Sequence, residues 1–114
     1  MSYSGYYTPS GWVFIKIQAY GEVEPLIKVF GSWSGGYLNG DSWRVNSGVT
    51  KIEENENEYI VSGYSGSQYI LSKTCNYIRP YNKAILDDMI AELRSYSHKA
   101  EIISVEEAMN IIEA

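Results

Sequence analysis

The apolar residues of this chain change their period once, at Arg79-Pro80. Before that point they fall in short alternating runs rich in β-branched and aromatic residues, which is typical of strands. After it they recur at the spacing of an amphipathic helix. The helical stripe consists of Ile85, Leu86, Met89, Ile90 and Leu93. Strands followed by helices predict an α+β fold: an antiparallel sheet of about five or six strands followed by two C-terminal helices.

Two hairpins account for most of the predicted sheet. Residues 12–20 (WVFIKIQAY) and 26–33 (LIKVFGSW) should pair around a turn at 21–25. Residues 58–62 and 68–73 should pair around the Gly- and Ser-rich turn between them. The two hairpins look alike only in their turn chemistry, so we infer no internal repeat.

A further strand should begin at Ser42, between the hairpins. Alternation places Trp43 and Val45 toward the core and Arg44 and Asn46 outward. Gly48 should break or bulge this strand before its continuation at 49–53.

The segment after Arg79 contains helix signals at two places. Pro80 can occupy the first turn of a helix, and Asn82 is a candidate N-cap. Residues 100–103 could form a short edge strand. Ser104 and Glu107 then have the spacing of a capping box, which opens a second helix. Its inward residues should be Val105, Ala108, Met109 and Ile112.

A length of 114 residues suits one domain, with a flexible N-terminal segment at 1–11, a sheet at 12–78 and a helical part at 81–113. A single cysteine excludes an internal disulfide. Residues 1–11 are polar and aromatic, so we expect no signal peptide. We therefore expect a cytoplasmic protein without a membrane segment.

The net charge of −5 is unevenly distributed, with seven acidic and three basic residues in 81–114. The nine lysines and arginines are scattered singly and form no basic stripe. Direct binding of nucleic acid through charge is therefore disfavoured.

One histidine and one cysteine leave little for catalysis or for a transition metal. We expect His98 to lie at the end of a helix, and Cys75 to be a small buried filler. The acidic residues at 53–58 lack the spacing and glycine of a calcium loop and predict a solvated turn. Only carboxylates and tyrosines could serve as acid or base, for instance Asp41 with Tyr37, and nothing orients them, so we predict no enzyme activity, no metal and no cofactor.

Eleven tyrosines and three tryptophans favour binding instead. Trp43, Tyr59 and Tyr69 fit the core of a small sheet. Other rings lie beside glycine-rich loops, where acidic and basic residues accompany them, and the acidic turn could meet a basic groove. The predicted partner-binding residues are Trp33, Tyr37, Asp41, Arg44, Tyr64, Glu54 and Glu56.

The first predicted strand also suggests self-association. Its Trp12, Phe14 and Tyr20 make a side that is too apolar for contact with water alone. If this strand is an edge, it could pair with a second copy as a homodimer.

Residues 42–71 (SWRVNSGVTKIEENENEYIVSGYSGSQYIL) contain a Trp-x-x-Asn-Ser-Gly run, an acidic turn and a Ser-Gly-Ser-x-Tyr hairpin. This segment resembles a pattern in small accessory proteins of phages and mobile elements, which include anti-CRISPR and other anti-defence inhibitors. The resemblance implies a non-catalytic inhibitor or adaptor that binds a host defence protein or protein–nucleic-acid complex in the host cytoplasm. It carries over no catalytic residues. The alternative is a carbohydrate or small-ligand binding module that uses exposed Trp and Tyr.

Overall fold

The computed structural model describes residues 6–36 and 40–113, without the side chains of 34–36, 40 and 41. In order, its elements are β1 (Tyr6–Tyr7), β2 (Gly11–Gln18), β3 (Leu26–Gly36), β4 (Gly40–Val45), β5 (Val49–Glu54), β6 (Glu58–Gly63), β7 (Gln68–Ser72), a 3-10 turn (Lys73–Cys75), α1 (Pro80–Ser95), β8 (Lys99–Ile103) and α2 (Val105–Glu113). The α+β class and both helices are confirmed.

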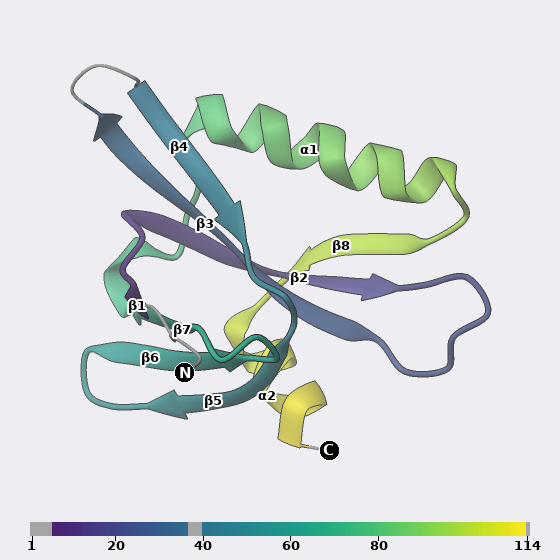
Figure 1. Ribbon diagram of the computed structural model, residues 1–114, viewed down its shortest axis with the longest axis horizontal. Coiled ribbons are helices and arrows are strands. Elements are labelled where there is room, and N and C mark those ends of the chain that lie inside the picture. The colour runs from purple at the N-terminus through teal and green to yellow at the C-terminus, as the bar shows by residue number, and fades with distance from the viewer. Residues whose placement is uncertain (1–5, 37–39, 114) are drawn as a thin grey trace.

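The strands form two four-stranded sheets with the orders β4-β3-β2-β8 and β1-β7-β6-β5. The prediction of a single sheet of five or six strands is therefore wrong. All neighbours pair antiparallel except β1 and β7, which are parallel. In Figure 1, α1 runs along the top of the view, β5, β6 and β7 lie at the bottom, and the sheet of β2, β3, β4 and β8 crosses between them.

The chain passes from one sheet to the other just after β4. Asn46 there donates its backbone N–H to the carbonyl oxygen of Val29, and its side-chain Oδ1 accepts the Val29 N–H at 2.9 Å. Asn46 thus closes the pairing with β3 and is only 4% exposed, so the prediction that it faces outward is wrong. Gly48, with a φ of 139°, then turns the chain into β5.

β2 is the centre of the molecule because both of its faces are buried. Trp12 and Phe14 face the other sheet and α2, whereas Val13 and Ile15 face α1. β3 and β8 flank β2 on its two sides. The expectation that this strand is an exposed edge is therefore wrong, since β2 has a neighbour on each side and its Trp12 and Phe14 are covered within the chain.

The two helices cover different parts of the sheets. α1 packs Leu86 and Ile90 on the outer face of the central sheet. It begins at Pro80, with Arg79 in the N-cap position, so Asn82 lies inside the helix and is fully buried rather than capping it. α2 places Ala108 in the core between the sheets. Its Ser104 Oγ accepts the backbone N–H of Glu107 at 3.0 Å, which confirms this half of the predicted capping box.

Candidate binding site

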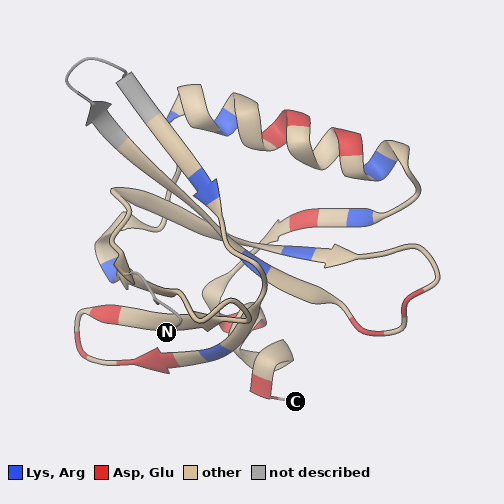
Figure 2. Cartoon of the chain, in the orientation of Figure 1, with Lys and Arg blue, Asp and Glu red and all other residues tan. Residues whose placement is uncertain are grey.

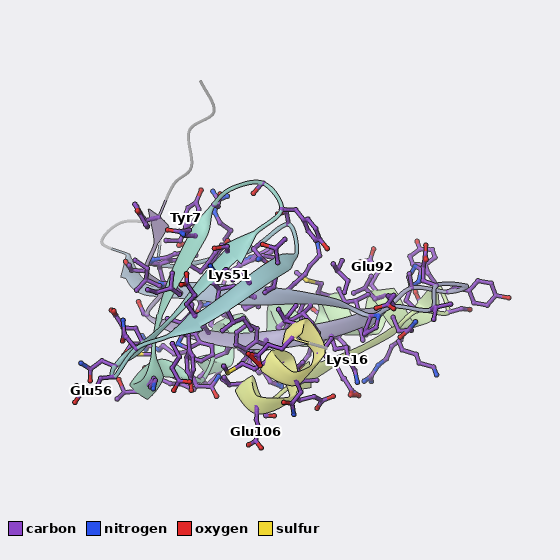
Figure 3. The ribbon with its side chains drawn as sticks, turned by 90° about the horizontal axis from the view of Figure 1, so that it is seen from below. Tyr7, Lys16, Lys51, Glu56, Glu92 and Glu106 are labelled. Carbon is purple, nitrogen blue, oxygen red and sulfur yellow. The ribbon has the colours of Figure 1, made fainter. Side chains whose placement is uncertain are left out.

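The predicted partner-binding residues do not gather on one surface. Trp33 lies in β3, half-buried and packed against the core. Tyr64 is 70% exposed in the turn between β6 and β7. Glu54 and Glu56 lie at the far end of the β5–β6 hairpin, where Figure 3 labels Glu56 well away from Tyr7. Tyr37 and the side chain of Asp41 lie outside the described residues.

Arg44, one of the predicted partner-binding residues, lies over an aromatic ring. Its Cζ lies 4.5 Å from the ring centroid of Tyr7, a cation–π contact. The Tyr7 ring also lies 5.1 Å from that of Tyr69, which is buried in the core. Burial raises the pKa of Tyr69 to about 12, while the positive charge of Arg44 acts in the opposite direction. Tyr7 has no local sequence signal, because its place depends on the non-local pairing of β1 with β7.

A larger concave surface lies between α1 and the outer face of the central sheet, and we call it the α1 groove. Its volume is about 460 Å³, which is within the range of ligand sites. The apolar lining consists of Ile15, Ile17, Val45, Met89 and Leu93.

Two aromatic rings of the α1 groove are open to solvent. Trp43 is 42% exposed and stacks on Phe30, with the ring centroids 5.6 Å apart and the planes at 10°. Tyr96, just after α1, is 68% exposed. Trp43 is therefore only partly a core residue, contrary to prediction. The stacking uses one face of its indole, so the ring can still meet a ligand.

The α1 groove has a mixed polar lining made by Lys28, Glu92 and His98. His98 follows α1 as predicted, but its Nδ1 accepts the backbone N–H of Tyr20 at 2.9 Å. An accepting Nδ1 requires the proton of a neutral ring to lie on Nε2. His98 thus ties the end of the β2–β3 hairpin to the end of α1.

The described residues offer little for metal chemistry or for spanning a membrane. Across 6–36 and 40–113, no three His, Cys, Asp or Glu side chains lie close enough together to hold a metal ion. Within the same ranges, no helix has the length and apolar character needed to span a bilayer. Cys75 is half-buried and unpaired with another cysteine.

In comparisons with known proteins, no family model, no curated protein and no solved structure matches this chain.

Proposed function

We propose that this chain is a small non-catalytic inhibitor or adaptor that binds a larger protein through the α1 groove. The observation that carries the proposal is the pair of solvent-exposed rings, Trp43 and Tyr96, on an open apolar groove. Aromatic side chains of this kind supply large contact areas with few rotors and dominate interface hot spots. An apolar segment of a partner would bury these rings together with Met89 and Leu93.

The class of partner rests on the resemblance of residues 42–71 to anti-defence proteins, which implies a host defence protein or protein–nucleic-acid complex in the host cytoplasm. The acidic balance of the chain supports this class. Figure 2 shows acidic residues in the β2–β3 and β5–β6 turns, on α1 and at the end of α2. With a net charge of −5, the chain would be steered toward a basic protein surface.

A matched pair of tyrosine variants tests the proposal. Tyr96→Ala removes a ring from the α1 groove, whereas Tyr81→Ala removes an equally exposed ring, at 66%, from the other end of α1. Co-purification from a bacterial lysate with mass spectrometry should first identify a stoichiometric partner. Its affinity should then fall at least about tenfold with Tyr96→Ala and stay unchanged with Tyr81→Ala.

Two outcomes contradict the proposal. If no protein is recovered in stoichiometric amount, the proposal that the chain binds a protein partner is contradicted. If the two tyrosine variants lower the affinity equally, the α1 groove is not the docking site. Trp43→Ala provides a second groove variant, so the result does not depend on one residue.

A second candidate function is a carbohydrate-binding module, favoured by the stacking of Trp43 on Phe30. One face of the indole is occupied by Phe30 and the ring remains partly exposed, which suits stacking against a sugar ring. Lys28 and Glu92 beside it could form hydrogen bonds with hydroxyl groups. On a glycan array the native chain should then give signals that Trp43→Ala abolishes. An array without signals would contradict carbohydrate binding and would leave protein binding as the remaining proposal.

A further inference from the structure

A second pocket, which we call the basic pocket, lies where β4 ends beside the β6–β7 turn. It has a volume of about 340 Å³ and is distinct from the α1 groove, although Lys28 and Val45 border both. The polar residues on which the argument rests are Lys28, Arg44, Asn46, Ser47, Ser65 and Ser67.

The basic pocket has positive charge without a matching acid. Lys28 and Arg44 both line it, and no aspartate or glutamate does. Among the described residues, neither cation forms an ion pair with a carboxylate. Arg44 is held over the ring of Tyr7, which itself lines the pocket. In a chain with a net charge of −5, two cations left facing one cavity point to an anionic ligand.

Asn46 supplies a second and independent observation. Its Oδ1 is occupied by the N–H of Val29, so the orientation of the amide is fixed by the end of β4. Its Nδ2 is buried and has no hydrogen-bond partner among the described residues. A buried N–H donor without an acceptor is unfavourable, and because Asn46 lines the pocket, a ligand oxygen that reaches Nδ2 would satisfy it.

The serines can add donors around the same cavity. Ser47 Oγ accepts the backbone N–H of Ser65 at 3.0 Å, which leaves its own hydroxyl hydrogen available to donate. Ser65 and Ser67 also line the pocket, from the β6–β7 turn. Amide, hydroxyl and cationic donors therefore line the pocket from three separate segments of the chain: β3, the end of β4, and the β6–β7 turn.

We propose that the basic pocket binds the phosphate group of a small phosphate monoester. A monoester carries nearly two negative charges at neutral pH and three acceptor oxygens, which suits two cations and several neutral donors. A carboxylate has one charge and two oxygens in a plane, so it would leave part of this donor set unused. The volume exceeds that of a phosphate group alone and leaves space for part of the organic group.

The test compares phenyl phosphate with benzoate and with inorganic phosphate, by NMR titration of the full chain at constant ionic strength. Phenyl phosphate should bind saturably and shift the amide signals of Ser47, Ser65 and Ser67. Its affinity should exceed that of both other anions by at least about fivefold. Equal affinity for benzoate would overturn the assignment to phosphate, and equal affinity for inorganic phosphate would overturn the assignment to a monoester.

Variants that each remove one positive charge distinguish binding in the basic pocket from long-range attraction by the charge of the whole protein. Arg44→Gln and Lys28→Gln should each weaken phenyl phosphate binding at least about tenfold, while Lys51→Gln, on β5, should leave it unchanged. An equal loss in all three variants would overturn the proposal, since only long-range charge would then be acting. Ser67→Ala, which changes no charge, should weaken phenyl phosphate binding as well. It keeps the test valid if one of the charge variants fails to fold.

A phosphoserine peptide provides the last comparison. Binding at least about tenfold tighter than that of free phosphoserine would overturn the small-molecule assignment in favour of a phosphorylated protein. The Arg44→Gln and Ser67→Ala results are independent of the α1 groove, because Arg44 and Ser67 line the basic pocket alone, whereas Lys28 borders both.

Discussion

The indole nitrogen of Trp12 donates a hydrogen bond to the main-chain carbonyl oxygen of Ser72, at 2.8 Å. Trp12 lies on β2 in the central sheet, and Ser72 ends β7 in the other sheet. This bond therefore crosses between the two layers of strands. Around it, the ring of Trp12 packs edge-to-face with Phe14 and Tyr59, so a polar link is embedded in the largest apolar cluster.

Trp12→Phe should lower the free energy of unfolding by about 2–4 kcal/mol. The substitution removes the donor to Ser72, leaves its carbonyl oxygen in a partly buried site, and reduces the volume of a fully buried side chain. Urea unfolding followed by circular dichroism measures the loss. Trp43→Phe is the control, because Trp43 is half-exposed, and it should cost less than about 1 kcal/mol. Similar losses for both variants would contradict a special role for the Trp12 bond.

Asn46→Ala should cost about 1–3 kcal/mol, because it leaves the N–H of Val29 buried without its acceptor. Asn57→Ala, in the exposed turn between β5 and β6, is the matched control and should change stability by less than about 0.5 kcal/mol. Hydrogen exchange offers a local reading: the amide of Val29 should exchange faster in Asn46→Ala than other amides of β3. Unchanged protection of Val29 would show that water replaces the side chain.

Gly48→Ala should destabilise the chain for two separable reasons. Its φ of 139° is unfavourable for a residue with a side chain, and a Cβ there would lie 2.7 Å from the ring of Tyr64. Gly21 also has a positive φ, of 82°, but has open space around it, so Gly21→Ala measures the backbone effect without a clash. We expect about 1–2 kcal/mol for Gly21→Ala and up to about 0.5 kcal/mol more for Gly48→Ala, where the clash adds to the backbone effect.

A double-mutant cycle of Gly48→Ala with Tyr64→Ala isolates the clash. Tyr64 is exposed, so its ring can move aside and the coupling should be below about 0.5 kcal/mol. A larger coupling would show that the ring of Tyr64 is held in place over Gly48.

Lys16→Met should lower stability by about 0.5–1 kcal/mol at neutral pH. Lys16 Nζ lies 3.0 Å from Glu107 and 3.7 Å from Glu101, and thereby links β2 to α2 and β8. The hydrogen bond with Glu107 is the main cause that raises the pKa of Lys16 above 10.5. A raised lysine pKa gives stability that is complete below 10.5 and is lost as the pH rises through the folded-state value.

The stability difference between the native chain and Lys16→Met should therefore be constant from about pH 7 to pH 9 and shrink above 10.5. Thermal unfolding across this pH range measures it. Lys51→Met is the control, because Lys51 has only an exposed contact with Glu53 at 3.7 Å and should show little effect. A gap that persists unchanged at high pH would attribute the loss to packing of the lysine stem instead.

Local patterns predicted the hairpins and helices well because turn residues and apolar periods are properties of neighbouring residues. The division into two sheets depends instead on the turn of the chain at Asn46 and Gly48, where no local preference distinguishes a bulge from a change of sheet. β2 did contain a usable signal: apolar residues occur at both its odd and even positions, which is typical of a strand covered on both faces. An exposed edge was the alternative explanation of this apolar side, and the position of β2 inside the sheet contradicts it.

The site was harder to predict because a ring's exposure depends on which element covers its side of the sheet. Trp33 and Trp43 lie in neighbouring strands, yet Trp33 packs against the inner core and Trp43 borders the α1 groove. The register, which pairs Trp43 with Ser32 and Trp33 with Ser42, puts the two rings on opposite faces of the sheet, and α1 covers the face of Trp43 only in part. Tyr7, Tyr96 and Lys28 also lack a local signal, because their surroundings are formed by residues far away in the sequence.

The pairing of Phe14 with Ile103 has a consequence for the order in which the protein can be assembled. During synthesis, β2 and β3 emerge long before β8. One edge of β2, which is apolar, therefore stays unpaired until residues 99–103 have been made. Such an open edge is a template for association between nascent chains. Expression at lower temperature, or with chaperones that bind apolar segments, should therefore raise the soluble yield more than substitutions on the folded surface would.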